Sequence, residues 1–438
     1  MEQAQESGKK LSNFFVIWAG QAFSLLGSQL VSFALVWWLT EKTGSATILA
    51  LASMMAILPQ VLLGPIAGAL VDRWNRRMVM ITADVLIAAL TALLAYLFLI
   101  DAAQVWHIYT IMLLRSLGGA FHWPAMQAST TMLVPEKHLA RANGLNQLLN
   151  GALSIMAPPL GALLLAVLPM QGILAIDVVT ALVAVGTLLL IHIPQPARAG
   201  AEAGSTSVWQ DFREGLAFIW AWPGLMIVLG IAMILNLLVN PGFSLLPILV
   251  TKHFGGGAIE LGLLESAWGV GMIIGGLLLS LWGGFKRRIV TGMAGIAGTG
   301  LGIIVLGVAP ANMLWLAVAA LAFSASTNAM SNGALFATLQ AVVPPDKQGR
   351  VFTIVMSGAM LMTPIGLAIA GPVADALGVQ VWFLIGGAAS VLMGVGAFFI
   401  PALMQIEEQV RPSEAVEATP EENAASSTAA LPDTLSSD

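Results

Sequence analysis

The chain has 438 residues, of which 58% are hydrophobic and 9% are charged, with a formal net charge of −5 and no cysteine. A soluble domain carries roughly 25% charged residues, so this composition excludes an ordinary soluble fold. The absence of cysteine excludes disulfides, a thiol catalyst and a Cys-ligated metal site.

Twelve apolar segments follow one another along the chain. A transmembrane helix needs about 20 apolar residues, and most of these segments lack the polar face of a soluble helix. They lie near 14–39, 46–71, 78–100, 106–133, 141–168, 172–193, 223–251, 258–282, 289–309, 312–342, 351–375 and 379–404. We predict an all-α integral membrane protein with twelve transmembrane helices. The first segment is longer than a cleavable signal peptide, so we expect it to be retained.

The basic residues are distributed unequally between the two sides of these spans. Fifteen of the 18 Lys and Arg residues lie in the termini or in loops after even-numbered spans. The other side carries only Lys42 and Lys252, and Arg115 falls inside a span. Cytoplasmic loops carry the Lys and Arg excess. We therefore expect a multi-pass protein of the cell inner membrane with both termini in the cytoplasm.

The loop between spans 2 and 3 reads Gly-Ala-Leu-Val-Asp-Arg-Trp-Asn-Arg-Arg over residues 68–77. Its charge alone suits any cytoplasmic loop. The pattern, however, resembles the signature loop of the major facilitator superfamily, with Asn75 in place of a glycine; Asn tolerates a left-handed backbone. The resemblance implies a cytoplasmic gate that ties this loop to neighbouring helix ends, notably span 11, when the protein is open to the outside. The gate residues would be Gly68, Asp72, Arg73, Arg76 and Arg77.

Asp84 lies in the inner half of span 3, one turn or more beyond Arg76 and Arg77. We expect it to form a structural ion pair with the signature loop.

Span 4 contains Arg115 and Gly119, which match the second motif of the same superfamily. A guanidinium in hydrocarbon is costly, so Arg115 should face the protein interior or water and have a partner. Two roles remain open, namely a purely structural ion pair and the tuning of a proton-carrying carboxylate.

Span 5 contains Pro158, Pro159 and Gly161, in a degraded version of the superfamily's antiporter motif. Each proline ring removes a backbone hydrogen bond, which predicts a kinked helix. In the family this motif marks exporters.

The chain divides after span 6. Residues 133–141 and 342–350 both run from an apolar residue through Val-Pro to a final Arg. This repeat, together with the resemblance, predicts two pseudo-symmetric six-helix bundles, 1–194 and 223–404. Residues 195–222 form a cytoplasmic linker with an amphipathic helix, which lies at the membrane interface or packs on the loops. Residues 405–438 are expected to be a disordered acidic cytoplasmic tail.

Glu265 in span 8 and Asp177 in span 6 lie at a depth similar to that of Arg115. Burial favours a neutral carboxyl group, whereas a nearby guanidinium favours the charged form, so a carboxyl group under both influences can titrate near physiological pH. We predict Glu265 as the proton carrier, with Asp177 as the second choice and Arg115 as the tuning cation. The competing interpretation of Glu265 is a solvated helix-end residue.

Several amides lie inside the spans, where they either line a cavity or join helices. These candidates are Gln21, Gln29, Asn146, Asn150, Asn236, Asn240, Asn328 and Asn332. The histidines lack metal-ligand spacing, and no Walker loop or catalytic constellation is present. We expect no metal, no cofactor, no nucleic-acid partner and no enzymatic activity.

Residues 11–404 as a whole resemble the macrolide-efflux branch of the drug–proton antiporters. The stretches that carry this resemblance include 17–22, 39–46, 120–125, 175–178 and 271–276. The resemblance implies a proton-coupled exporter of amphiphilic small molecules in the lipid bilayer, working by alternating access and contributing to antibiotic resistance. We expect the protein to be a monomer. The alternatives are proton-coupled uptake, siderophore or metabolite export, and a non-transporting receptor or scaffold.

Overall fold

The computed structural model describes residues 2–191, 193 and 208–408, and within these ranges all regular structure is helical. Six long helices form the first half of the chain. They are α1 (Glu2–Thr43), α2 (Ala46–Val71), α3 (Arg76–Leu99), α4 (Val105–Leu133), α5 (Glu136–Val167) and α6 (Met170–Leu190).

The second half repeats this plan with one interrupted helix. Its members are α8 (Pro223–Leu238), α9 (Asn240–Leu249), α10 (Ala258–Trp282), α11 (Arg288–Val308), α12 (Leu314–Val342), α13 (Pro345–Leu377), α14 (Val379–Gly396) and the short α15 (Pro401–Met404). The helices α8 and α9 adjoin at Val239, and a π-helical turn, Val250–Phe254, extends α9, so these pieces together make one span.

Eleven segments of the described chain are long and apolar enough to cross a membrane. The exception is α4, whose 29 residues, about 43 Å at 1.5 Å per residue, are long enough to cross a membrane. Its composition is less apolar than that of the other eleven segments. Arg115 and two histidines lower its hydropathy. Since α4 packs against both α2 and α3, we count it as the twelfth predicted span.

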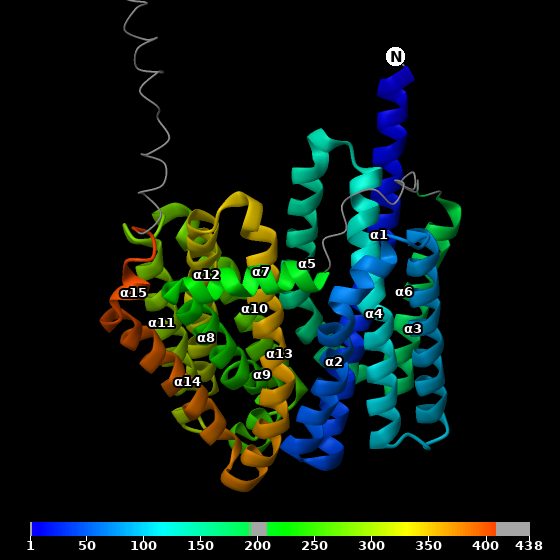
Figure 1. Cartoon of the computed structure of the whole chain (residues 1–438). Helices are drawn as coiled ribbons and strands as arrows, with labels where there is room; N and C mark the ends of the chain where they lie inside the picture. The colour runs from blue at the N-terminus through cyan, green and yellow to red at the C-terminus, as the bar shows by residue number, and fades with distance from the viewer. Residues whose placement is uncertain (1, 192, 194–207, 409–438) are drawn as a thin grey trace, which may run out of the picture.

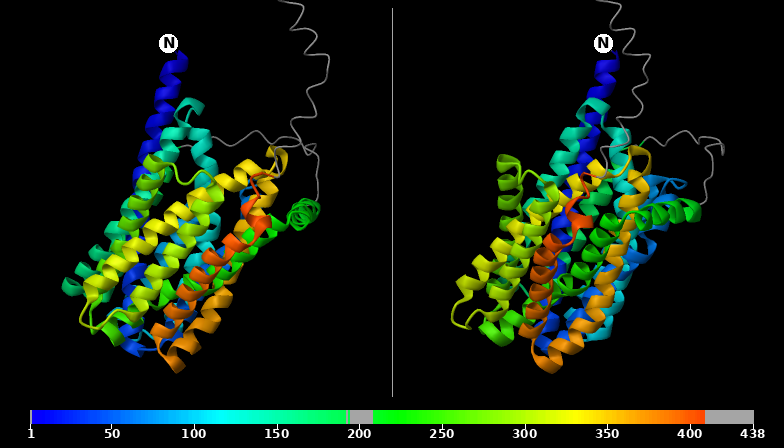
Figure 2. Two further views of the ribbon diagram at one scale, coloured as in Figure 1. Left: turned by 90° about the vertical axis from the view of Figure 1, so that its left-hand side faces the viewer. Right: turned by 60° about the vertical axis from the view of Figure 1, so that its left-hand side comes forward.

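The long helices run roughly alongside one another in two groups, α1–α6 and α8–α14 (Figures 1 and 2). Within the first group, α1 and α3 pack on α6, and α4 packs on α2 and α3. Within the second, α11 packs on α12 and α14, and α10 packs on α12. The groups meet mainly through two pairs, α2 with α13 and α5 with α10. Any site shared by the two groups must therefore lie near these pairs.

A shorter helix, α7 (Val208–Ala221), lies across the long ones (Figure 1). Glu214 pairs with Arg350 at 2.7 Å, the ammonium of Lys347 lies 4.9 Å from the centre of the Phe218 ring, and Gly215 packs on Ile354. These contacts attach α7 to the start of α13. The rest of the expected linker, 194–207, and the tail from 409 onward lie outside the described residues.

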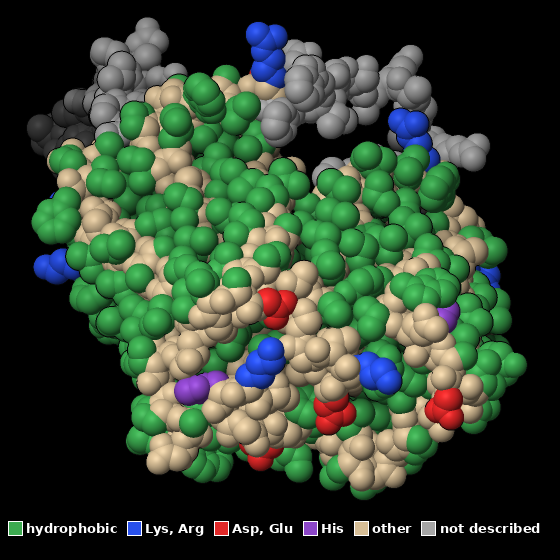
Figure 3. Space-filling model, turned by 90° about the horizontal axis from the view of Figure 1, so that it is seen from below, with side chains coloured by type: hydrophobic (Ala, Val, Ile, Leu, Met, Phe, Trp, Pro, Cys, Tyr) green, Lys and Arg blue, Asp and Glu red, His purple; other side chains and the backbone are tan. Residues whose placement is uncertain are grey.

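The two ends of the bundle differ in charge. We call the end that holds residues 2 and 408 the terminal face, and the other end the opposite face. The opposite face carries few basic side chains, mixed with acidic and histidine side chains (Figure 3). This difference follows from the loop charges in the sequence and gives the molecule a polarity along its long axis.

Candidate functional site

Glu265 faces a cavity of about 320 Å³ between the two helix groups, which we call the central cavity. The cavity is lined from α1, α5, α9 and α10. Its lining residues are Gln29, Ser32, Phe33, Val36, Leu153, Ser154, Ala157, Pro158, Phe243, Leu246, Glu265 and Trp268. Among the described residues Glu265 has no hydrogen-bond or ion-pair partner. An intramembrane carboxyl group is costly to retain, so one that faces a cavity is a candidate for a substrate or ion pathway.

The two adjacent prolines of α5 leave a backbone carbonyl without its helical donor, and α10 contacts this carbonyl beside the cavity. Pro159 has no N–H to offer the carbonyl four residues earlier, that of Ile155. The hydroxyl of Ser266 on α10 donates to this carbonyl oxygen at 2.8 Å. Gly262 lies so close that a Cβ there would be 3.1 Å from the Pro158 carbonyl oxygen. The prolines therefore expose backbone polarity that a neighbouring helix satisfies, and α5 runs on as one helix through both rings.

Gly161 completes the proline motif by allowing α5 to approach α1. A Cβ at Gly161 would lie 2.8 Å from the Phe33 ring, which itself lines the central cavity. The glycine thus fixes the cavity wall.

A second contact joins the groups at the opposite face. Asp375, near the end of α13, accepts hydrogen bonds from the Ser45 hydroxyl at 2.8 Å and from the backbone N–H groups of Ala46 and Thr47 at 2.8 and 2.9 Å. A carboxylate at a helix N-terminus satisfies free N–H groups and the helix dipole. One turn earlier, a Cβ at Gly371 would lie 2.7 Å from the Thr47 Cα. Asp375 was not among the predicted sites; its position at the end of a span was the available signal.

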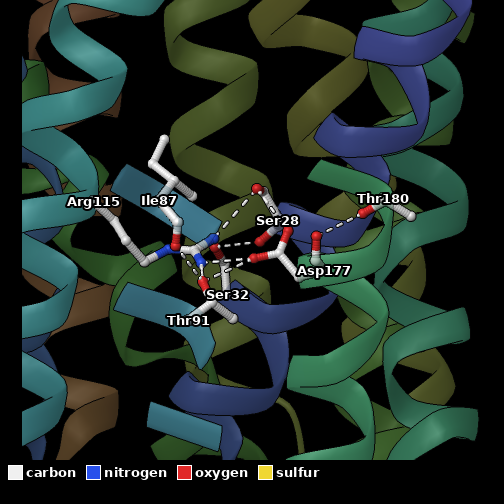
Figure 4. A network of polar contacts seen from close by, with 7 residues as sticks. All are labelled: Ser28, Ser32, Ile87, Thr91, Arg115, Asp177 and Thr180. Atoms are coloured by element: carbon white, nitrogen blue, oxygen red, sulfur yellow. Dashed lines mark hydrogen bonds and ion pairs between the residues drawn. The ribbon is translucent and has the colours of Figure 1, made fainter. Parts of the chain in front are cut away.

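Arg115 and Asp177 form a buried ion pair within the first group, with Nη1 2.6 Å from Oδ2 (Figure 4). Asp177 is fully buried and also accepts hydrogen bonds from Ser28 at 3.0 Å and Thr91 at 3.1 Å. Arg115 contacts the hydroxyls of Thr91 and Ser28 as well. Arg115, predicted as the cation that tunes Glu265, instead pairs with Asp177, the second-choice carboxylate, in this conformation. The face of α4 that carries Arg115 points toward α3 and α6, where Asp177 supplies the counter-charge.

The signature loop joins helices of the first group. Arg77 donates to the carbonyl oxygens of Leu188 and Leu189 at the end of α6, both at 2.7 Å, and Arg76 donates to the Ala128 carbonyl at 3.0 Å. Asp72 pairs with Arg76 at 3.1 Å. The Asp72 side chain remains 69% exposed, so the contact with span 11 implied by the resemblance is not formed in this conformation. Gly68 has open space around it, and Arg73 borders a groove on α3 and α4.

Asn75 does not use the left-handed tolerance suggested by the motif. Its φ is −71°, and its side chain accepts a hydrogen bond from the Met78 N–H at 3.1 Å, which caps the start of α3. The departure from glycine at this position thus has a local structural role.

The predicted partner of Asp84 is wrong. Asp84 accepts a hydrogen bond from Gln21 at 3.0 Å, and its Oδ1 lies 3.3 Å from the Nε2 of His122. This last contact is within ion-pair distance but too poorly aligned for a hydrogen bond. Asp84 lies about two turns from Arg77, whose guanidinium is held by α6. Sequence reasoning missed His122, although it lies seven residues after Arg115, on the same face of α4.

The amide candidates separate into distinct environments. Four of them line a cavity of about 220 Å³ inside the second group: Asn236, Asn240, Asn328 and Asn332. Gln29 lines the central cavity, whereas Gln21 contacts Asp84. The remaining two lie on α5, where Asn146 accepts a hydrogen bond from Trp18 and Asn150 is exposed.

A helical chain with these membrane spans, in two groups that meet around a cavity, has the architecture of a membrane transporter of the major facilitator type. Its fold is similar to that of a bacterial homologue of the iron transporter ferroportin in an inward-facing state, with a TM-score of 0.68 at 15% identity, covering 91% of this chain and 99% of that one. The nucleoside transporter NupG gives a TM-score of 0.68 at 13% identity, over 88% of this chain and 98% of that one.

Sequence comparison places the chain more narrowly. Residues 9–428 match the model of a family described as transmembrane secretion effector, and the chain belongs to this family. It is 34% identical to macrolide efflux protein A of Streptococcus pyogenes over 382 residues, covering 87% of this chain and 94% of that protein. It is 28% identical to the multidrug efflux pump Tap of Mycolicibacterium fortuitum, covering 88% and 95%. The chain is therefore a transporter and not an enzyme.

Proposed function

We propose that this protein exports amphiphilic small molecules in exchange for protons, by alternating access, from a bacterial inner membrane with both termini in the cytoplasm. The observation that carries the proposal is Glu265. Its carboxyl group faces a cavity between the two moving halves and has no partner among the described residues. Such a group can bind a proton in one state and release it in another when its hydration changes.

The contacts between the groups support alternating access. Asp375 and Ser45 on one side, and Ser266 and Ile155 on the other, hold the groups together toward the opposite face. Among the described residues, the hydrogen bonds that Arg76 and Arg77 donate from the signature loop at the terminal face go to carbonyls of the first group. Since Lys and Arg concentrate at the terminal face, this face is assigned to the cytoplasm, and the conformation is the one open inward.

The cavity linings favour a cargo that is apolar with neutral hydrogen-bonding groups. Phe33, Phe243 and Trp268 supply aromatic surface next to Glu265. In the neighbouring amide cavity, Asn332 donates to Asn328 at 2.8 Å and Asn240 donates to Asn236 at 2.6 Å. Each amide has more capacity than these bonds use, so acceptors and donors remain for cargo. Export is favoured over uptake because the relatives compared above are named efflux proteins.

The test uses proteoliposomes with an imposed pH gradient and a macrolide as the first cargo. Glu265→Gln removes the titratable group at nearly constant shape. We expect gradient-driven transport to fall at least tenfold, while exchange of cargo without a gradient persists.

The matched control is Glu260→Gln on the same helix. The carboxylate of Glu260 accepts a hydrogen bond from the Gly257 N–H at 2.7 Å and is not part of the cavity. Glu260→Gln should retain gradient-driven transport. Equal gradient-driven transport by wild type and Glu265→Gln would remove Glu265 from the mechanism. The absence of any cargo movement across a panel of amphiphiles would favour a receptor or scaffold.

A further inference from the structure

Two polar layers cross the first helix group, one above the other. The layer nearer the opposite face contains Ser28, Thr91 and Arg115, from α1, α3 and α4. The layer nearer the terminal face contains Gln21, Asp84 and His122, from the same three helices. On every helix the two positions are seven residues apart, about 10 Å along the axis. The layers are therefore equivalent in position and differ in chemistry.

The layer nearer the opposite face contains a permanently charged side chain, that of Arg115. It pairs Arg115 with Asp177, and an arginine is not deprotonated in proteins. The positive charge of the guanidinium and the negative charge of the carboxylate cancel as long as both groups are ionised. This layer joins α1, α3, α4 and α6 through the contacts of Asp177.

The layer nearer the terminal face has histidine at the position of the arginine, and the charge of a histidine can change. Asp84 is 4% exposed and its other oxygen is held by Gln21, so the carboxyl group is fixed in place. The Nε2 of His122 faces Oδ1 of Asp84, is sealed from solvent and makes no hydrogen bond. About 14% of the imidazole side chain remains exposed, which leaves its other edge a route for proton exchange.

The charge balance of this pair depends on one proton. With it, the pair is an imidazolium facing a carboxylate, or a neutral imidazole facing a carboxylic acid, and its net charge is zero. Without it, an uncompensated carboxylate remains, and burying an isolated charge is strongly unfavourable. Dehydration therefore favours the form of the pair that carries the proton, and hydration favours its release.

We propose that Asp84 and His122 form a second proton-binding site of this transporter, separate from Glu265, which exchanges its proton during the transport cycle. The proposal rests on the proton coupling proposed above and adds a site in the first helix group, whereas Glu265 belongs to the second.

The surroundings leave the pair as the exchangeable group of this region. Facing it, α2 carries no charged residue, α6 carries only Asp177, and the stretches 11–40 of α1 and 142–167 of α5 carry none. On α3 and α4 the nearest cations are Arg77, which is held by two carbonyls of α6, and Arg115, which is held by Asp177. Within the described part of the chain, neither arginine contacts the pair.

The direct test is histidine NMR on the full chain in lipid nanodiscs. The chain has five histidines, so ¹⁵N-histidine labelling gives few signals, and His122→Gln identifies the signal of interest. We expect the His122 imidazole to change protonation between pH 5 and 9. Asp84→Asn should move the midpoint by at least tenfold in proton concentration. Glu265→Gln should leave the His122 titration present, which separates this site from the proposed coupling carboxylate.

The matched control is His107→Asn, on the same helix. The Nδ1 of His107 accepts a hydrogen bond from the Gln104 N–H at the helix start, outside the layer. His107→Asn should leave the His122 titration unchanged. A His122 signal that stays in one form from pH 5 to 9, or that titrates identically in Asp84→Asn, would overturn the proposal.

A second measurement links the proton to the cycle. Because the chain has no cysteine, spin labels at Lys42→Cys and Asn312→Cys report the distance between the groups at the opposite face by pulsed EPR. The proportion of closed molecules should depend on pH. His122→Asn and Glu265→Gln should each remove part of this dependence, and the double variant should be flat. A pH profile of His122→Asn equal to that of wild type would show that the pair takes no part in the cycle.

Discussion

Asp177 accepts three hydrogen bonds in a site that excludes solvent, and one of them comes from a charged donor. Arg115→Leu would leave this carboxylate buried without its counter-charge, and breaking a buried pair costs about 3–5 kcal/mol. We expect a clear fall in the thermal unfolding temperature of the purified protein. Replacing both partners, as in Arg115→Leu with Asp177→Leu, should recover much of the loss because no charge remains. An unchanged unfolding temperature in the single variant would contradict the structural role.

The environment of Arg115 and Asp177 was predictable from the sequence only in part. The cost of a guanidinium in hydrocarbon predicted that Arg115 has a partner. The depth of each acidic residue in the membrane restricted that partner to Asp177 or Glu265. The choice itself depends on the rotation of α4 about its axis, which depth does not specify. The seven-residue spacing of Arg115 and His122 puts both on one face, and Asp84 then meets His122 rather than the signature loop.

At the scale of helices, α5 and α10 form a contact that requires small side chains. Gly262→Leu would place a branched side chain where even a Cβ lies 3.1 Å from the Pro158 carbonyl oxygen. We expect this variant to separate α5 from α10 and to reduce the closed population at the opposite face by about tenfold. Gly276→Leu is the control, because Gly276 on the same helix has open space around it. Pulsed EPR between the two groups measures the outcome, and equal distance distributions in both variants would contradict it.

The sequence predicted the elements of this contact but not the contact. Pro158 and Pro159 predicted freed carbonyls and a kink, since these follow from the proline ring alone. That Ser266 satisfies the Ile155 carbonyl depends on packing between residues 111 positions apart. The twelve spans were predictable because hydrocarbon imposes length and composition locally. Among the described helices counted as spans, α4 alone falls short in hydropathy, because of Arg115 and its two histidines.

At the scale of the whole molecule, α2 and α13 carry an acid at the C-terminal end of each helix, on opposite faces. Asp375 now caps the start of α2, which holds the opposite face closed. Asp72, at the end of α2, is exposed, and the resemblance to the superfamily implies that it contacts the start of α13 in the other state. We infer that this helix pair has a capping acid for each conformation, and that the two caps compete.

Asp375→Asn tests this competition. The amide keeps the shape of the carboxylate but loses the charge that favours the α2 N-terminus, an effect of about 0.3–1 kcal/mol per helix end and up to ~2 kcal/mol when partly buried. We expect the outward-open population to rise by about twofold to thirtyfold, as measured by labelling of a cysteine placed in the central cavity with a reagent that does not cross the membrane. Glu41→Gln on the same face, where the structure gives Glu41 no partner among the described residues, should label as wild type does. If Asp375→Asn and wild type label at equal rates, the charge of Asp375 does not hold the opposite face closed, and the small residues of the two helix pairs would then account for the closure.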